Sequence, residues 1–163
     1  MVNLDVFEPL VLDLADALRT QGLHIATAES CTGGLIAAAC TAVAGSSDWF
    51  ERGFVTYSNA AKTELLGVGE DLLRAHGAVS EPVARAMAEG ALQRAPVQRA
   101  VAVTGIAGPG GAVPGKPVGT VWLALARRDG PTHSRLLQLG GDRAAVRQAT
   151  VVAALRALRD SVG

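Results

Sequence analysis

The sequence contains little cysteine or histidine, and this scarcity argues against a metal-supported fold. Only two cysteines and three histidines occur among the 163 residues. Cys31 and Cys40 are predicted to lie on one helix. Nine residues of helix span about 13 Å, which is too far for a disulfide between the two cysteines. No Cys or His spacing resembles a zinc ligand set. We therefore expect neither a metal ion nor a cofactor.

The chain also lacks excess charge and long apolar runs. Fifteen basic residues balance fifteen acidic ones, which gives no electrostatic case for nucleic acid or an anionic membrane. Residues 1–5 lack the basic segment and apolar core of a leader, and no apolar run approaches the roughly 20 residues of a membrane span. We expect a cytoplasmic protein that binds a small molecule, with no nucleic-acid or membrane partner.

Glycines and prolines separate segments with helical or strand periodicity. One domain over residues 1–163 is long enough to bury a core. Apolar spacings of three and four predict a first helix over residues 4–21, ending at Gly22. Further helices are predicted over 35–39, 60–66 and 71–75, from 81 onward, and from 143 to 158. Strands are predicted over 23–26, 53–57, 100–103, 119–126 and 134–139.

This order of elements predicts an α/β fold, specifically a single-domain three-layer α/β/α sandwich with a mixed, mostly parallel sheet. Strands separated by helices should pair in parallel, and a turn at Asp129-Gly130 should form a late antiparallel hairpin. Residues 106–117 are rich in glycine and proline and predict a long loop. An exposed apolar strand or helix face would favour a homodimer or a higher homo-oligomer.

The stretch TAESCTGG at residues 27–34 is the most informative in the chain. It lies between an apolar strand and a run of helix formers, at the strand end where open α/β sheets usually bind ligands. The free N–H groups of a helix start, around Thr32, Gly33 and Gly34, suit an anion or a developing oxyanion. A serine or threonine here is equally well explained as a helix N-cap.

Ser30 is the first candidate nucleophile, and Cys31 is its rival. A serine hydroxyl needs a base to take its proton. Thiolates are favoured at helix N-termini, but no histidine is placed to act with Cys31, and a buried cysteine usually just packs. We rank Ser30 above Cys31. Glu29 either accepts hydrogen bonds from Lys62 or a substrate hydroxyl, or caps the helix.

Lys62 is the candidate base, since it follows the second strand and lies in the first turn of a helix. Burial and the positive end of the helix dipole both favour a neutral amine, against an ordinary pKa of about 10.4. The alternative is a solvated surface lysine. Tyr57 could orient the amine, relay a proton or simply end the strand. Ser58 or Asn59 caps the helix, and Asn59 is also a candidate substrate contact.

Two later regions offer further substrate contacts. The glycine-rich stretch after the strand at 100–103 lacks the Gly-x-x-x-x-Gly-Lys-Ser/Thr pattern and a following helix, so an NTPase loop is disfavoured. We expect it to line a pocket, starting at Thr104 and Gly105. Arg143 and Arg147, one turn apart on the last helix, would either hold a phosphate or form surface ion pairs.

Long motifs in a fixed order resemble the CinA C-terminal-domain family. They are TAESCTGG at 27–34, GFVTYSN at 53–59 with Lys62, GAVS at 77–80, VTGIAGPGG at 103–111, KPVGTVW at 116–122 and GDR at 141–143. The likeness covers nearly the whole chain. Many family members carry a larger N-terminal domain, so this chain looks like the stand-alone form.

The resemblance implies a nicotinamide-nucleotide amidase of NAD recycling, which converts nicotinamide mononucleotide (NMN) to nicotinic acid mononucleotide and ammonia without a metal. It also implies that Ser30 is the nucleophile and Lys62 the base. Tyr57, Thr104 and the two late arginines would support catalysis or bind the substrate. Two alternatives stay open: a non-catalytic nucleotide-binding or regulatory module linked to competence or DNA damage, and an amidase for a different amide.

Overall fold

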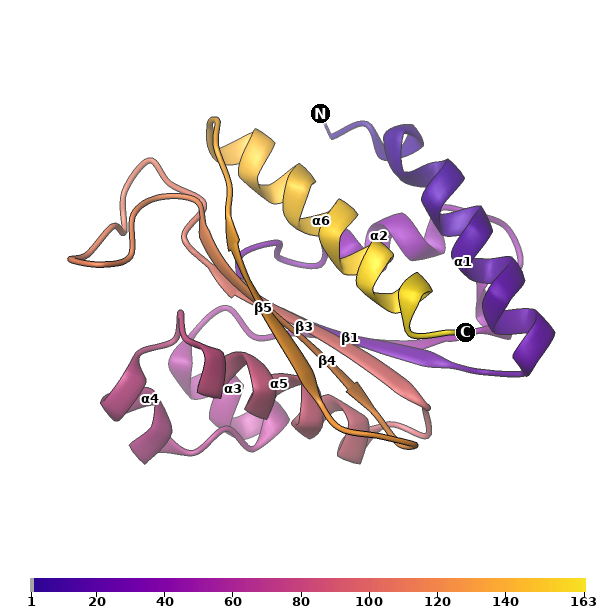
Figure 1. The fold of residues 1–163 in the computed structure, drawn as a ribbon, viewed down its shortest axis with the longest axis horizontal. Coiled ribbons are helices and arrows are strands. Elements are labelled where there is room, and N and C mark those ends of the chain that lie inside the picture. Colours follow the sequence, from indigo (N-terminus) through magenta and orange to yellow (C-terminus); the bar gives the residue numbers. More distant parts are fainter. Residues whose placement is uncertain (1) are drawn as a thin grey trace.

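In the computed structural model, which describes residues 2–163, a five-stranded sheet lies between two layers of helices (Figure 1). The strand order is β2-β1-β3-β4-β5. The strands are β1 (Ile25–Glu29), β2 (Phe50–Val55), β3 (Arg99–Gly105), β4 (Thr120–Arg127) and β5 (His133–Gln138). β1 pairs in parallel with β2 and β3, whereas the β3–β4 and β4–β5 pairs are antiparallel. Within residues 2–163, β4 is therefore the one strand that runs against the others, and the predicted α/β sandwich with a mixed sheet is confirmed.

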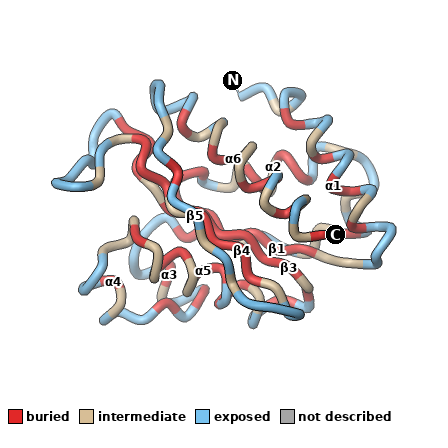
Figure 2. The backbone as a smooth tube through the Cα atoms, viewed as in Figure 1, coloured by how far each residue is buried: buried red, intermediate tan, exposed pale blue. Residues whose placement is uncertain are grey.

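Helices α1 (Glu8–Gln21), α2 (Leu35–Thr41) and α6 (Arg143–Asp160) cover one face of the sheet (Figure 1). Large apolar side chains fill this layer, among them Phe7, Trp49 and Leu155. Short 3-10 helices precede α1 (Leu4–Phe7) and β2 (Ser46–Asp48). Buried residues recur along these helices and fill the central strands of the sheet (Figure 2), and the burial of their apolar surface stabilises this face.

Helices α3 (Asn59–Leu66), α4 (Glu70–His76) and α5 (Glu81–Arg94) cover the opposite face. The sheet presents small side chains to α5, including Ala28, Ala102 and Ala124. Gly90 of α5 lies so close to α3 that an added Cβ would be 2.0 Å from the carbonyl oxygen of Leu66. Small residues therefore bring α5 close to the sheet, and α3, with its lysine, close to α5.

The first predicted helix ends where expected, because Gly22 adopts the left-handed conformation (φ 65°) that favours glycine. The first strand extends further than predicted, through Glu29, so the first three residues of the TAESCTGG stretch belong to β1. Helix α2 starts only at Leu35. Cys31 therefore lies in the turn before α2, and the prediction that it shares a helix with Cys40 is wrong. Both cysteines are free thiols.

Among residues 2–163, no helix combines the length and the hydropathy that crossing a bilayer would require.

Candidate active site

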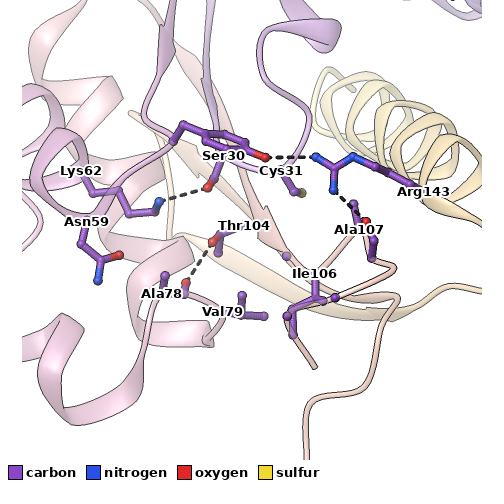
Figure 3. Close-up of a pocket in the computed structure, with 15 residues that line it drawn as sticks. Ser30, Cys31, Asn59, Lys62, Ala78, Val79, Thr104, Ile106, Ala107 and Arg143 are labelled. Carbon is purple, nitrogen blue, oxygen red and sulfur yellow. Dashed lines mark hydrogen bonds between the residues drawn. The ribbon is translucent and has the colours of Figure 1, made fainter. Parts of the chain in front are cut away.

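The carboxyl ends of β1, β2 and β3 open into one pocket of about 270 Å³ (Figure 3). Parallel pairing explains this convergence, because it places the end of each of these strands at the same edge of the sheet. The predicted site residues that line the pocket are Ser30, Cys31, Tyr57, Asn59, Lys62, Thr104, Gly105 and Arg143. The other predicted residues, Glu29, Thr32, Gly33, Gly34 and Arg147, lie outside its lining.

Ser30 and Lys62 are in contact. The amine Nζ of Lys62 lies 3.0 Å from Ser30 Oγ (Figure 3). It also donates a hydrogen bond to the carbonyl oxygen of Thr56 at 2.9 Å. The Lys62 side chain is almost fully buried, and this desolvation lowers its pKa. A neutral amine can keep its bond to Thr56 and turn its lone pair toward the serine hydroxyl, which is the arrangement of a nucleophile with its base.

The local sequence explains how Lys62 reaches this position. The hydroxyl of Ser58 caps α3 by accepting from the amide of Ala61, so the helix starts just beyond β2. The amide of Thr56 donates to the carbonyl of Glu29, which ties the chain leaving β2 to the end of β1. Lys62, in the first turn of α3, then faces the turn that holds Ser30.

Cys31 also lines the pocket but is poorly suited to be the nucleophile. Burial, with a smaller contribution from the Glu29 charge, raises the pKa of its thiol to about 11, although Arg147 and Lys62 oppose the shift. The thiol therefore stays protonated near neutral pH. The neighbouring amine contacts Ser30 instead.

The turn between β1 and α2 has three amides without a protein acceptor. Among residues 2–163, the N–H groups of Cys31, Thr32 and Gly34 donate to no protein group, whereas the Gly33 N–H donates to the carbonyl of Ser30 at 3.0 Å. The expectation of a free Gly33 amide is therefore wrong. Gly33 and Gly34 both have positive φ (59° and 101°), which favours glycine at these positions.

Glu29 caps α2, one of the two roles expected for it. Its carboxylate is fully buried and accepts from the Thr32 hydroxyl at 2.5 Å and from the amides of Ile36 and Ala37 at 2.8 and 3.0 Å. A carboxylate is favoured at a helix N-terminus by the unpaired amides and the helix dipole. The residue at the N-cap position itself is Gly34, so neither Ser30 nor Thr32 caps this helix by its own hydroxyl.

Arg143 and Tyr57 form the rim of the pocket. The guanidinium of Arg143 donates to the Tyr57 hydroxyl at 3.1 Å and to the carbonyl of Gly108 at 2.8 Å (Figure 3). Tyr57 is 63% exposed, and its hydroxyl meets Arg143 rather than Lys62. The described lining contains two basic side chains, Lys62 and Arg143, and no acidic one. The guanidinium of Arg143, with no acidic side chain beside it in the described lining, favours an anionic ligand.

Thr104 and Asn59 lie on the remaining walls. The Thr104 hydroxyl donates to the carbonyl of Ala78 at 3.0 Å, which joins β3 to the segment before α5 (Figure 3). Sequence reasoning did not select Ala78 or Val79, which also line the pocket. The quoted motif GAVS contains both residues, but neither has a polar side chain that would have marked it.

No group of three or more His, Cys, Asp or Glu side chains that could hold a metal ion occurs in the described part of the chain, residues 2–163.

The structure is a three-layer α/β fold with a buried serine–lysine pair at the carboxyl edge of its sheet. A nucleophile paired with a base in this way is typical of a hydrolase site. The chain belongs to the CinA C-terminal domain family, whose model matches residues 7–162. The family predicted from the motifs is thus confirmed.

Several relatives match this chain over nearly its full length. It is 54% identical to the nicotinamide-nucleotide amidohydrolase PncC of Enterobacter agglomerans, covering 94% of each chain. It is 52% identical to the protein of the same name from Escherichia coli K12, covering 89% of this chain and 88% of the relative. A CinA-like protein of Akkermansia muciniphila is 56% identical over 88% of this chain, which spans only 35% of that longer relative.

Solved structures share the fold. The competence/damage inducible protein CihA of Agrobacterium tumefaciens superposes with a TM-score of 0.93 at 48% identity, covering 96% of this chain and 94% of that one. A CinA superfamily protein of Escherichia coli gives a TM-score of 0.90 at 37% identity, covering 97% and 91%.

Proposed function

We propose that this chain is a nicotinamide-nucleotide amidase that hydrolyses the carboxamide of NMN to nicotinic acid mononucleotide and ammonia. The observation that carries the proposal is the 3.0 Å contact between Ser30 Oγ and the buried amine of Lys62, inside a pocket whose described lining holds no acidic side chain. The identity of the substrate is inferred from relatives of matching length that are named nicotinamide-nucleotide amidohydrolases.

In the first half of the reaction, Ser30 Oγ attacks the carboxamide carbon while neutral Lys62 takes the hydroxyl proton. The tetrahedral oxyanion forms beside the turn after β1, where the amides of Thr32 and Gly34 are candidate donors. One lost donor in such a site typically costs about 3 kcal/mol of transition-state stabilisation. Lys62 then gives its proton to the nitrogen as the C–N bond breaks, and ammonia leaves.

In the second half, water hydrolyses the ester on Ser30. Lys62, neutral again, takes a proton from the attacking water, and the acyl C–O bond breaks as the proton returns to Ser30 Oγ. The carbonyl of Thr56 holds the amine in place through both halves. The product is nicotinic acid mononucleotide.

Arg143 and the loop after β3 bind the ribose phosphate in this proposal. Arginine matches phosphate by its forked donors, and Gly111 has a positive φ value (91°) of the kind that lets successive amides face an anion. Tyr57 orients the guanidinium through its hydroxyl.

The test is ammonia release from NMN by the wild type and by Ser30→Ala, Lys62→Ala and Cys31→Ala. We expect kcat to fall by roughly 10⁴-fold or more in the first two and by less than about threefold in the third. Full turnover in Ser30→Ala would overturn the mechanism, and loss only in Cys31→Ala would make Cys31 the nucleophile. If the protein binds NMN but releases no ammonia, it is a non-catalytic nucleotide-binding module. If it hydrolyses simple carboxamides whether or not they carry a phosphate, it is an amidase for a different amide.

A further inference from the structure

Arg147 lies outside the pocket, although it follows Arg143 by one turn of α6. Its Nη2 donates to the carbonyl of Thr32 at 3.0 Å, across 115 residues of sequence. An added Cβ on Gly33 would lie 3.8 Å from the same Nη2, so the guanidinium packs against the backbone of the turn. Arg147 is thus placed to hold the peptide unit that joins Thr32 to Gly33.

Glu29 holds the same residue by its side chain. The Thr32 hydroxyl donates to the Glu29 carboxylate at 2.5 Å, and both residues are fully buried. Thr32 is therefore bonded to a cation through its carbonyl and to an anion through its hydroxyl. Cys31 belongs to the same turn, and Glu29 raises the pKa of its thiol whereas Arg147 lowers it, which agrees with this placement.

We propose that Arg147 and Glu29 are positioning residues that act through Thr32 to hold the turn after Ser30 in its reactive geometry. Neither side chain lines the pocket in which the proposed reaction takes place. The turn needs external support because its own bonds are few: Gly33 N–H to Ser30 and Leu35 N–H to Thr32. The kinetic part of this inference rests on the proposed amidase function.

A positioning role predicts a specific kinetic signature. Displacing reactive groups by about 1 Å can cost on the order of 100-fold in rate. A phosphate ligand would instead affect the binding of the nucleotide. Loss of Arg147 should therefore lower kcat and leave KM for NMN nearly unchanged.

The first experiment compares Arg147→Met with Arg128→Met as a matched control. Arg128 also donates to backbone carbonyls, those of Leu92, Ala95 and Val97, but it follows β4 at the opposite edge of the sheet. We expect Arg147→Met to lower kcat about 10- to 100-fold, with KM within about threefold of wild type. Arg128→Met should lower the melting temperature and leave both constants unchanged. A raised KM with normal kcat in Arg147→Met would overturn the inference, as would wild-type values.

A second pair tests the Glu29 contact. Thr32→Val removes the hydroxyl at similar volume, whereas Thr32→Ser keeps it. We expect the valine variant to show the same selective loss of kcat and the serine variant, which keeps the hydrogen bond to Glu29, to retain at least about tenfold more kcat than the valine variant. Equal activity of the two variants would contradict the role of this bond. Arg147→Lys should recover part of the lost kcat, because an ammonium can still donate to Thr32.

A third readout does not depend on NMN. A small sulfonyl fluoride reacts with an activated serine: the Ser30 Oγ–S bond forms, the S–F bond breaks, fluoride leaves and the hydroxyl proton passes to Lys62. We expect the labelling rate, followed by protein mass, to fall about tenfold or more in Arg147→Met and not in Arg128→Met. Equal rates would overturn the inference. If wild type releases no ammonia from NMN but its labelling still depends on Arg147, the amidase proposal fails and the positioning role stands.

Discussion

The turn after β1 and the loop after β3 form two sides of the same pocket and are built in opposite ways. The turn, residues 30–34, is short, largely buried and bonded to the charged side chains of Glu29 and Arg147. The loop, residues 106–119, is long and mostly exposed, and it projects beyond the sheet (Figure 1). Its side-chain bonds to the rest of the protein include Arg143 to Gly108 and Lys116 to His76.

This contrast separates two tasks. A nucleophile and its base must keep a fixed separation, which suits a buried turn. A nucleotide must enter and leave, which suits a loop with few contacts. Changes in the turn should therefore affect kcat, and changes in the loop or its arginine should affect KM. Three predictions test this division.

The largest expected effect is the pH dependence of kcat/KM, which Lys62 beside the turn should control. Lys62 acts as a base only when neutral, so kcat/KM should rise about tenfold per pH unit until the pH passes the Lys62 pKa. Burial lowers that pKa, so the plateau should begin below the ordinary value of about 10.4. The measurement is the pH–rate profile with NMN. A profile without an acid limb down to about pH 5 would contradict Lys62 as the base.

Stability provides an independent check on the same shift. Because the folded-state pKa of Lys62 is lowered, the unfolded chain binds more protons between the folded and unfolded pKa values. The free energy of unfolding should therefore rise with pH in that window, relative to Lys62→Met. Denaturant titrations of both proteins at several pH values measure the difference. A constant difference would show that the pKa of Lys62 is ordinary.

The next largest effect concerns the rim. Arg143→Met removes the cation that we assign to the phosphate, so KM for NMN should rise about 10- to 100-fold, with kcat changed much less. Steady-state kinetics distinguish this from the Arg147→Met result. As a control, inhibition by nicotinic acid mononucleotide should weaken in Arg143→Met and persist in Arg147→Met. Identical behaviour of the two arginine variants would remove the contrast between turn and loop.

The smallest effect lies within the loop. Gly108 has a φ of +83°, and a Cβ there would lie 2.5 Å from Val118 Cγ1, whereas a Cβ on Gly110 would meet nothing within 4 Å. Gly108→Ala should raise KM roughly three- to tenfold and lower the melting temperature by about 2–4 °C for each kcal/mol of strain. Gly110→Ala should match wild type. A strong loss of kcat in Gly108→Ala would contradict the assignment of this loop to binding alone.

Local sequence patterns were sufficient to predict most of the secondary structure of this protein and the positions of its candidate catalytic residues. Periodicity located all six α-helices and five strands of residues 2–163, because each element buries one face or both. Strand borders shifted by two or three residues at β1 and β2, since hydrogen bonds to neighbouring strands determine where pairing stops. The sequence also placed Ser30 and Lys62 after two strands that should be parallel, and parallel strands end at the same edge.

Other features depended on contacts between distant segments. The sequence could not separate Arg143 from Arg147, which share a helix and a chemistry. One faces the pocket, and the other bonds to Thr32, because the rotation of α6 on the sheet directs them differently. Nor could it show that Glu29 caps α2, or that the Gly33 amide is already paired. The sequence by itself determined which groups reach the catalytic edge, whereas the packing of α6 and α2 decided which of them face the pocket and which support it from behind.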